Sequence, residues 1–342
     1  MFLNTINIQN FRSISTLKVE DLGQINVFTG ENNCGKTTLL EAVFQLSTWQ
    51  LNGLLLLNRY RSPFQTNTNV SGFFHNIEDN QISITGIFER MYQRTVKIYY
   101  TTPSVNEFNN TGIVIQSTLS ESQKIAKQSK PVISKGQIDN GNLVINPLIE
   151  KPQVSLVCSF PSFKVFEHTD LVKILSEIIK NKQESKIVDL LRQVDSRIRN
   201  IAVVENSILL DLDGFPKLMP IEISGDGLRR ILSVLLSIYV VGKGGIVLID
   251  EVENGLHFST MPKFWRSIIN AAKELNVQLF ITTHNEELLQ SLNTTAQEES
   301  YEEIQHKIRY YNLKRYPNDE IVAYKYDFEK FGFLISNGNE IR

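Results

Sequence analysis

This 342-residue sequence has few cysteines, a net charge close to zero and no long apolar run. The two cysteines, Cys34 and Cys158, are too few for a disulfide framework, so a reducing interior is expected. The 35 basic and 37 acidic side chains leave a formal charge of −2, which gives no sign of a polyanion-binding protein. Residues Met1–Asn4 lack the flank and apolar run of a secretory leader, and the longest apolar stretch, Ile231–Val241, is too short to span a bilayer. The sequence therefore predicts a cytoplasmic protein with no membrane insertion.

Hydrophobic residues make up 42% of the sequence, which is enough for a sizeable core. The length corresponds to about two domains. Alternating side chains over residues 2–8 and 16–20 predict strands, and Gln24–Thr29 is typical of a buried strand that runs into a glycine. Apolar residues on one face after Gly35 predict a helix. The order of strand, glycine loop and helix indicates an α/β fold.

Residues 52–161 differ in composition, with Asn, Ser, Thr and Gln abundant. Short β-like runs at Ile82–Phe88 and Thr95–Tyr100, separated by turn residues, predict an inserted antiparallel β region. Within it, Thr101–Asn142 is especially poor in apolar residues, and we expect either a mobile loop or the flexible tip of an arm there.

A helical lobe is expected over residues 166–241. Apolar residues at three- and four-residue spacing indicate helices over Asp170–Lys180 and Lys186–Arg197. A strand-like stretch, Ile201–Leu212, and a buried helix, Leu228–Val241, follow.

A βαβ unit and a hairpin are expected after this lobe. Ile246–Ile249 is apolar on both faces, as a central parallel strand requires, and Val277–Thr283 is a second buried strand beyond the helix Met261–Glu274. Two β runs in the tail, Ile308–Leu313 and Ile321–Tyr326, predict the hairpin.

One motif carries the clearest chemistry. Gly30–Thr37 matches the pattern G-x-x-x-x-G-K-[ST] and lies between a buried strand and a helix, as a phosphate-binding loop requires. Its backbone N–H groups face the phosphates, Lys36 reaches the β and γ phosphates, and Thr37 ligates Mg²⁺. The expected nucleotide contacts are Gly30, Asn32, Asn33, Gly35, Lys36, Thr37 and Thr38. The alternative is a turn that only joins strand to helix. Cys34 in this loop is either a small residue that fits or a thiol with a lowered pKa.

Two adjacent carboxylates follow the strand Ile246–Ile249. Ligands of open α/β sheets gather at the carboxyl ends of the strands. Asp250 is therefore expected to hold Mg²⁺ through its water shell, and Glu251 to act as general base on an attacking water. The alternative is an exposed, idle acidic strand end.

A second glycine-rich turn, with Ser224, Gly225 and Gly227, precedes another expected helix. The N-terminus of that helix is also suited to bind an anion. Because one nucleotide cannot easily use two such turns of one subunit, this turn is expected to bind the γ-phosphate of ATP held by a second protomer. Ser224 is otherwise a plain helix cap. Arg229 and Arg230 either contact phosphate or nucleic acid or lie on an exposed helix flank.

Histidine supplies the last candidate. His284 follows the strand Val277–Thr283, where a neutral imidazole can hydrogen-bond the γ-phosphate or the attacking water; a capping residue is the alternative. His257 is either structural or at an interface, and no Cys/His spacing suggests zinc. The expected catalytic residues are Glu251, His284 and Lys36, and the expected Mg²⁺ ligands are Thr37 and Asp250.

Together these motifs resemble the P-loop ATPases of the ABC/SMC-like class, and within it the stand-alone AAA-type proteins related to the OLD (overcoming lysogenization defect) family. The likeness is carried by Ile8–Ser13, Gly30–Ala42, Phe74–Asn76, Gly225–Gly227, Leu248–His257 and Thr282–His284. It implies an α/β fold: a P-loop ABC-type ATPase head with a mixed sheet, an antiparallel β insertion and a helical lobe that carries the signature motif. It also implies an ATPase domain over residues 1–295 and a C-terminal hairpin extension, 296–342, packed on it.

The same resemblance implies a head-to-tail dimer with ATP sandwiched between the phosphate loop of one subunit and the Ser224 turn of the other. It implies that Phe11 and Arg12 lie near the nucleotide and that Asn254–His257 crosses the dimer interface. The glutamine loop of the family has only Gln153 as a candidate.

The sequence also departs from its relatives. Asn285 follows His284 where relatives commonly carry serine. Full OLD proteins continue into a TOPRIM nuclease domain, but too few residues follow His284 for one. Any nuclease is therefore expected to be a separate chain.

Three function classes stay open. The first is a Mg²⁺-dependent ATP hydrolase that regulates or powers a separate effector, such as a nuclease in bacterial phage defence, a role that rests on the resemblance alone. The second is a DNA-binding ATPase of DNA repair, which the near-neutral charge disfavours. The third is a non-hydrolysing ATP-dependent scaffold, against which Glu251 and His284 argue. A transporter subunit fits the inserted β region poorly.

Overall fold

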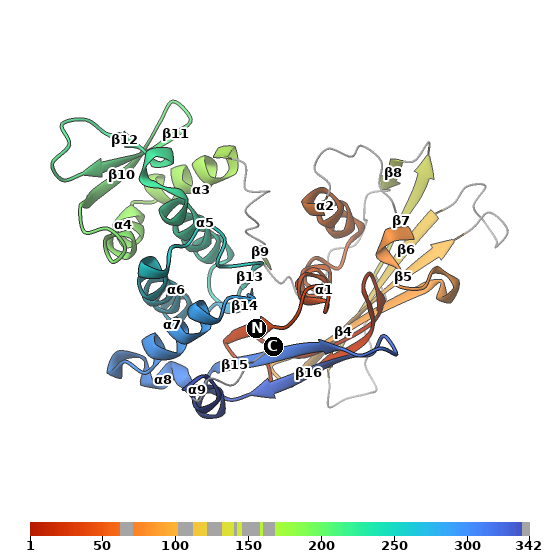
Figure 1. The fold of residues 1–342 in the computed structure, drawn as a ribbon. Coiled ribbons are helices and arrows are strands. Elements are labelled where there is room, and N and C mark those ends of the chain that lie inside the picture. The colour runs from red at the N-terminus through yellow and green to blue at the C-terminus, as the bar shows by residue number, and fades with distance from the viewer. Residues whose placement is uncertain are drawn as a thin grey trace.

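Three layers make up the protein (Figure 1). The computed structural model describes residues 1–61, 71–101, 112–121, 132–139, 142–145, 158–159 and 168–336. A central mixed sheet lies between a group of helices on one side and, on the other, the helix α1 (Lys36–Thr48) together with an antiparallel sheet. Among the described residues, no helix has the length and apolar character needed to cross a lipid bilayer.

The central sheet has six strands in the order β16-β15-β3-β14-β13-β9. Strand β3 pairs in parallel with β14 and β15, β14 with β13 and β13 with β9, whereas β16 is antiparallel to β15. The carboxyl ends of β3, β13 and β14 therefore share one edge, and the segments after them meet there. The bounds are β3 Ile25–Thr29, β9 Cys158–Ser159, β13 Ile246–Ile249, β14 Gln278–Thr282, β15 Ile308–Arg315 and β16 Ile321–Tyr326.

The antiparallel sheet contains the N-terminal strands and the inserted β region together. Its order is β2-β1-β4-β5-β6-β7-β8, so β1 joins the insertion through β4. The bounds are β1 Leu3–Phe11, β2 Ile14–Val19, β4 Gln81–Phe88, β5 Tyr92–Thr101, β6 Gly112–Glu121, β7 Val132–Asp139 and β8 Asn142–Ile145.

Of the two alternatives for Thr101–Asn142, the loop is wrong for the described part of that range, and the arm tip stays a prediction. Residues 112–121 and 132–139 are strands β6 and β7. In β6, Ile113 and Ile115 are fully buried. Alternate apolar residues suffice for a strand that buries one face, so a low average apolar content did not indicate a loop.

The helices of the other side belong mostly to the lobe and the segments after β13 and β14. They are α3 His168–Lys180, α4 Glu184–Arg192, α5 Asp226–Val241, α6 Met261–Leu275, α7 Glu286–Ala296, α8 Glu302–Gln305 and α9 Phe328–Ser336; α2, Leu51–Arg61, follows α1 instead. Short 3₁₀ turns are η1 Ser71–Phe73, η2 Ile77–Asp79, η3 Ile221–Ser224, η4 Phe258–Thr260 and η5 Glu299–Tyr301.

The strand-like stretch expected at Ile201–Leu212 is a hairpin. Strands β10 (Ile198–Val204) and β11 (Ser207–Leu212) pair in antiparallel register, with β12 (Met219–Pro220) beside β11. Glu205 and Asn206 form the two-residue turn, with φ of 47° and 67°. Two successive positive φ angles fit a hairpin turn of the primed type.

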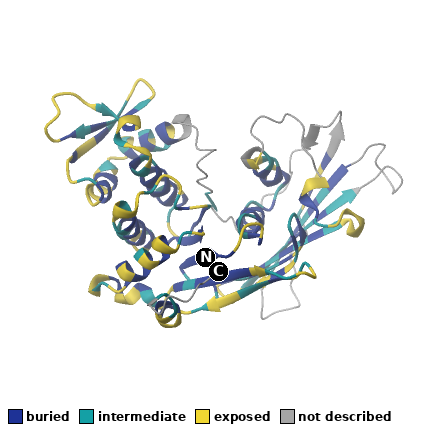
Figure 2. Cartoon of the chain, viewed as in Figure 1, coloured by how far each residue is buried: buried dark blue, intermediate teal, exposed yellow. Residues whose placement is uncertain are grey.

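Two cores pack against opposite faces of the central sheet. In β13, Val247 and Ile249 belong to the core on the helix side, while Ile246 and Leu248 belong to the core around α1 and the antiparallel sheet. All four are fully buried, and the strands in the middle of the molecule are correspondingly dark in Figure 2. Because alternate side chains of a strand point to opposite faces, a continuous apolar run fixes the middle layer.

The C-terminal hairpin is present, and it continues the central sheet. Strand β15 pairs with β3 with Ile308 opposite Ile25, and β16 forms the outer edge. The two strands therefore extend the sheet that carries the glycine loop. The division into residues 1–295 and 296–342 stays a prediction.

Candidate nucleotide-binding site

The carboxyl ends of β3, β13 and β14 border a cavity of about 850 Å³. Nine of the sequence-predicted site residues line it: Asn32, Asn33, Gly35, Lys36, Thr37, Thr38, Asp250, Glu251 and His284. Ser13, Arg61 and Arg315 line it as well. The parallel register of the strands thus brings three separate stretches of sequence to one place.

The glycine loop has a backbone that only glycine accommodates at its start. Gly30 has a φ of 137°, and a Cβ there would lie 2.3 Å from the carbonyl oxygen of Leu313. Lys36 donates from Nζ to the carbonyl oxygens of Gly30 at 2.6 Å and Glu31 at 2.8 Å. The N-cap of α1, Gly35, offers no side-chain cap, and the first turn holds no acidic residue. The first N–H groups of α1 are therefore suited to an anionic ligand.

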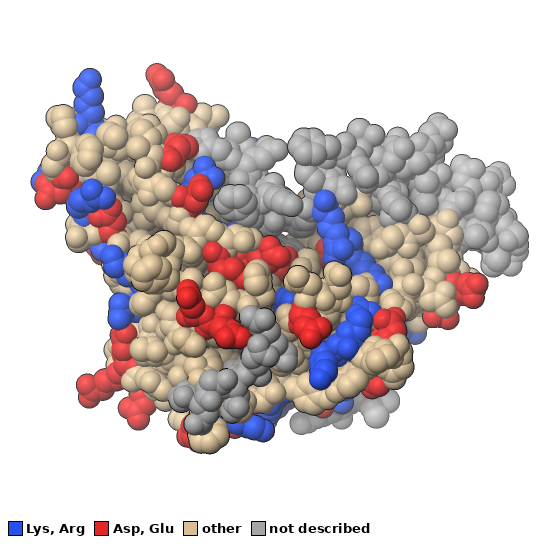
Figure 3. Space-filling model, viewed as in Figure 1, with Lys and Arg blue, Asp and Glu red and all other residues tan. Residues whose placement is uncertain are grey.

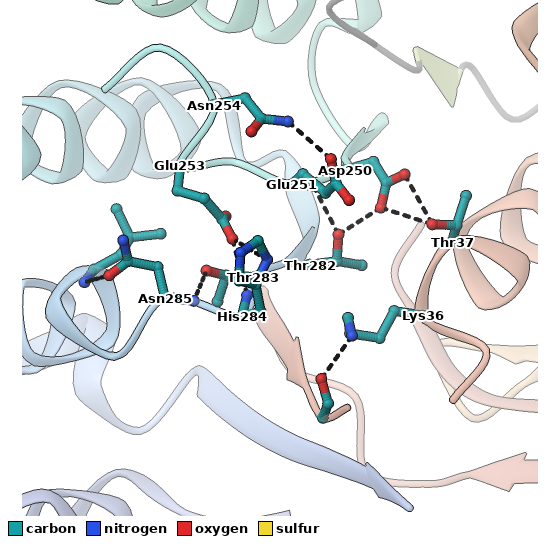
Figure 4. Close-up of polar contacts among 12 residues, drawn as sticks. Lys36, Thr37, Asp250, Glu251, Glu253, Asn254, Thr282, Thr283, His284 and Asn285 are labelled. Atoms are coloured by element: carbon teal, nitrogen blue, oxygen red, sulfur yellow. Dashed lines mark hydrogen bonds and ion pairs between the residues drawn. The ribbon is translucent and has the colours of Figure 1, made fainter. Parts of the chain in front are cut away.

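Asp250 is held by hydroxyl groups from two other segments (Figure 4). The hydroxyl of Thr37 donates to Oδ2 at 2.9 Å, and the hydroxyl of Thr282 donates to Oδ1 at 2.5 Å. Burial raises the pKa of Asp250, and the two hydroxyl contacts oppose that rise. Hydroxyl and carboxylate oxygens are the ligands that Mg²⁺ prefers, so the Thr37 and Asp250 pair fits this ion.

Glu251 follows in a left-handed backbone conformation, with a φ of 44°. Its N–H donates to the hydroxyl of Thr282 at 2.9 Å, and the amide of Asn254 donates to its Oε2 at 2.9 Å. The carboxylate is exposed to the cavity and lies next to Asp250 in Figure 4. Glu251 is therefore oriented by two hydrogen bonds and available to a water molecule.

His284 stands beside these carboxylates at the end of β14. Its Nδ1 lies 2.8 Å from Oε1 of Glu253, which also accepts the His284 backbone N–H at 2.9 Å. The His284 side chain is 59% exposed, whereas that of Glu253 is 8% exposed. A carboxylate that holds Nδ1–H leaves Nε2 of the neutral ring as an acceptor for a ligand in the cavity.

Comparisons with known proteins agree with this arrangement. The model of the AAA_21 family, described as "AAA domain, putative AbiEii toxin, Type IV TA system", matches residues 25–290. The chain belongs to this AAA family. It is 24% identical to an ATP/GTP phosphatase of Helicobacter pylori, over 98% of both chains. It also matches the DNA replication and repair protein RecF of Idiomarina loihiensis, at 44% identity, but over 14% of this chain and 13% of that protein.

A solved structure shares the fold of the AAA-family chain. The SMC head bound to the C-terminal winged-helix domain of ScpA superposes with a TM-score of 0.52 and 11% identity, covering 96% of this chain and 99% of the other. The predicted fold class, an ABC-type head with a mixed sheet, is confirmed. The AAA-family chain is an ABC/SMC-like P-loop ATPase, as the motifs predicted.

The glycine-rich turn at Ser224 does not line the nucleotide cavity of the same ATPase chain. Ser224 and Gly227 line a second hollow of about 410 Å³, together with Gly255 and His257. A Cβ at Gly227 would lie 3.1 Å from the carbonyl oxygen of Gly255, so the turn packs closely on the segment after the carboxylate pair. Gly225, with a φ of 87°, is the N-cap of α5. One subunit therefore does not bring this turn to its own phosphate loop.

Arg12 and Phe11 are not among the cavity-lining residues of the ATPase. Phe11 is fully buried in the core, and Nε of Arg12 lies 3.0 Å from Oε2 of Glu41. Burial lowers the pKa of Arg12 to about 10, against the opposing effect of Glu41. A contact between Arg12 and the nucleotide stays a prediction.

The sequence analysis missed Arg61 and Arg315 as residues of the site. Arg61 ends α2 and holds Glu41 through Nε at 2.7 Å. Arg315 ends β15, more than 270 positions after Asn33, and donates from Nε to the Asn33 carbonyl at 3.1 Å. Neither arginine belongs to a motif, so only the tertiary structure identifies them.

Four smaller predictions of the sequence have distinct outcomes. Burial raises the pKa of Cys34, so the idea of an activated thiol is wrong, and the residue is a small, buried part of the loop. His257 caps η4, where Nδ1 lies 2.9 Å from the hydroxyl of Ser259. Arg230 is buried and donates to the Asp250 carbonyl at 2.9 Å, so the exposed-flank alternative is wrong for it. Gln153 lies outside the described residues.

Proposed function

We propose that this ATPase is a Mg²⁺-dependent ATP hydrolase that works as an ATP-sandwiched homodimer and regulates or powers a separate effector. One observation carries the hydrolase: Lys36 and Thr37, Asp250 and Glu251, and His284 come from three distant segments and line one cavity. This set contains a cation for phosphate, oxygen ligands for a metal ion, and a carboxylate for water activation.

Each residue has a stated role in this proposal. Thr37 and Asp250 would hold Mg²⁺, which when bound neutralises charge on the phosphate oxygens. Lys36 would exchange its contacts with the loop carbonyls for β- and γ-phosphate oxygens. Glu251, oriented by Asn254, takes the proton of the attacking water.

His284 completes the site by accepting, at Nε2, a hydrogen bond from the water that attacks the γ-phosphate. Because Glu253 holds both Nδ1 and the backbone N–H of His284, the ring orientation depends on this carboxylate. The loop that carries Glu253 also contacts the Ser224 turn through Gly255. Occupancy of the γ-phosphate position can thereby be sensed close to the proposed dimer face.

Support for the dimer comes from the place of the glycine-rich turn. The turn offers an uncapped helix N-terminus at α5 but lies in a hollow of its own, away from the phosphate loop of the same chain. Ile223, which precedes Ser224, and Phe258, which follows His257, are 67% and 65% exposed, so large apolar side chains are exposed next to residues that line this hollow. A second copy would cover these side chains and place the turn on the partner's nucleotide.

A separate effector is the part of the proposal that the resemblance to OLD-family proteins supports. The family description also names a toxin of a type IV toxin–antitoxin system. We propose a nuclease in a bacterial phage-defence system as the effector, located in the cytoplasm with the ATPase.

DNA repair is the second candidate, because the short match to RecF favours it. Direct DNA binding predicts a continuous basic groove. On the face shown in Figure 3, basic and acidic side chains are mixed. ATP-dependent DNA binding that weakens steeply with salt would favour this candidate.

The test of the hydrolase is ATP turnover by the purified full chain with Mg²⁺, alone and with candidate effectors and DNA. Lys36→Ala is expected to lose nucleotide binding, and Glu251→Gln to bind ATP without hydrolysing it. Absence of turnover under all these conditions, with ATP still bound, would favour the scaffold instead.

A further inference from the structure

Arg315 connects the C-terminal hairpin to the phosphate loop. It is the last residue of β15, and its side chain, 27% exposed, lines the nucleotide cavity. All three of its side-chain nitrogens have protein partners. Nε donates to the carbonyl oxygen of Asn33, Nη2 donates to that of Ser13, and Nη1 pairs with the carboxylate of Asp319.

These three partners belong to three separate segments. Asn33 is in the phosphate loop, Ser13 is in the turn between β1 and β2, and Asp319 is in the turn of the β15–β16 hairpin. One planar guanidinium therefore connects two residues that line the cavity, Ser13 and Asn33, with the turn of the hairpin. A planar group with donors in a fixed fork can satisfy acceptors in several directions, which a single ammonium cannot do in the same way.

Asp319 is itself held from the other side. Its Oδ2 lies 2.8 Å from Nε2 of His75, and its carbonyl accepts the hydroxyl of Ser15 at 3.1 Å. Nδ1 of the same His75 ring lies 3.0 Å from the carbonyl oxygen of Arg12. Asp319 is thus anchored to the β1–β2 turn through His75 and Arg12, and to β2 through Ser15.

The contact with Asn33 matters because of the backbone conformation there. Asn33 has a φ of 64°, in the left-handed region, within a loop that must direct successive N–H groups toward phosphate oxygens. Holding its carbonyl oxygen outside the loop fixes the plane of the peptide between Asn33 and Cys34. A loop whose peptide planes are fixed in advance binds its anion without first having to become ordered.

We propose that Arg315, on the C-terminal hairpin, is a positioning residue: it sets the conformation of the phosphate loop that binds the nucleoside triphosphate. This inference rests on the proposed ATP hydrolysis. The fork geometry of the guanidinium is required to hold the loop in this conformation, and a positive charge alone at this position is not sufficient.

The experiment compares Arg315→Lys and Arg315→Gln with the wild-type full chain. We measure KM and kcat for ATP hydrolysis, and the Kd of a fluorescent trinitrophenyl-ATP. Since the loop binds ground state and transition state alike, both variants are expected to raise KM and Kd about tenfold and to leave kcat within about twofold. Asp319→Asn, which keeps the shape of the side chain, is expected to raise KM by a smaller factor.

Arg309→Gln is the matched control. Arg309 lies on the same strand and also pairs with an aspartate, since its Nε lies 3.0 Å from Oδ2 of Asp21, but it lines a different cavity. The KM of the Arg309→Gln variant for ATP is expected to equal that of the wild type. Asp319→Asn also serves as the test variant if thermal melting shows that the Arg315 variants do not fold.

The outcomes separate the two proposals. Recovery of the wild-type KM by Arg315→Lys would show a role of charge alone and overturn the inference, as would an unchanged KM in Arg315→Gln. A rise in KM that Arg309→Gln reproduces would overturn it too. A wild-type chain that neither binds nor hydrolyses ATP would refute the proposed function, and the inference with it.

Discussion

Thr37 and Asp250 lie 213 positions apart, and the hydroxyl of one donates to the carboxylate of the other at 2.9 Å. This contact joins the first turn of α1 to the end of β13. A metal ion inserted between the two side chains would meet oxygen ligands from both. The contact therefore joins the two predicted metal ligands directly.

Removing the ammonium of Lys36 is expected to abolish tight nucleotide binding. Lys36→Ala takes away the cation that would meet the β- and γ-phosphates, and we expect the Kd for ATP to rise at least about tenfold, since each hydrogen bond to a charged group contributes on the order of 1.5–3 kcal/mol. Binding of trinitrophenyl-ATP measures this. Lys180→Ala, on the exposed end of α3, is the control. Equal affinity in Lys36→Ala and the wild type would contradict the assignment of the loop.

Converting Glu251 to its amide is expected to separate binding from hydrolysis. Glu251→Gln cannot accept the proton of the attacking water, so kcat is expected to fall about 100-fold or more while ATP still binds. The bound ATP is then expected to hold the dimer together, which size-exclusion chromatography with ATP measures. Glu205→Gln, in the β10–β11 turn, is the control. A monomer at all ATP concentrations would refute the sandwich but not the general base.

Hydrolysis is expected to depend on a divalent ion through Thr37. Chelation with EDTA removes the ion that the Thr37 and Asp250 oxygens are suited to hold, and turnover is expected to stop and to return when Mg²⁺ is added. Thr37→Ala removes one of the two ligands and is expected to raise the Mg²⁺ concentration needed for half-maximal turnover. Thr294→Ala, at an exposed position of α7 that lines neither the nucleotide cavity nor the hollow of the Ser224 turn, serves for comparison. Full activity in EDTA would remove the metal from the mechanism.

The buried carboxylate of Glu41 is expected to contribute to stability. Glu41 and Arg12 have side chains that are 1% and 9% exposed, and burial raises the pKa of Glu41 while Arg12 and Arg61 oppose that rise. Glu41→Gln leaves the guanidinium of Arg12 buried without its counter-charge, so the free energy of unfolding is expected to fall by about 3 kcal/mol. Urea denaturation measures this. Glu177→Gln, in an exposed pair with Lys180, should leave the midpoint nearly unchanged.

Sequence pattern predicted the elements whose residues are locally consistent. The strand before Gly30, the helix after Gly35 and the apolar strand before Asp250 each combine a continuous signal with a motif at the end. The three pieces of the site were therefore predictable, and the shared sheet edge brings them together. Their assignment to chemical roles still awaits the measurements above.

Other features depend on contacts that no local pattern contains. The hairpin turn at Glu205 and Asn206 has no glycine, so the sequence alone predicts one strand-like stretch where the structure has β10 and β11. The strand β6 was hidden because its polar face lowers the average apolar content. Arg315 reaches Asn33 only because β15 pairs with β3, a partner far away in the sequence.

The position of β3 in the sheet has a consequence for biosynthesis. This strand leaves the ribosome long before its two neighbours in the sheet, β14 and β15, because they follow it at a great distance in the sequence. Until they emerge, the nascent polypeptide presents two unsatisfied edges of an apolar strand, which invite incorrect association. A dependence on chaperones during translation is therefore expected for a nucleotide pocket whose strands lie so far apart in the sequence.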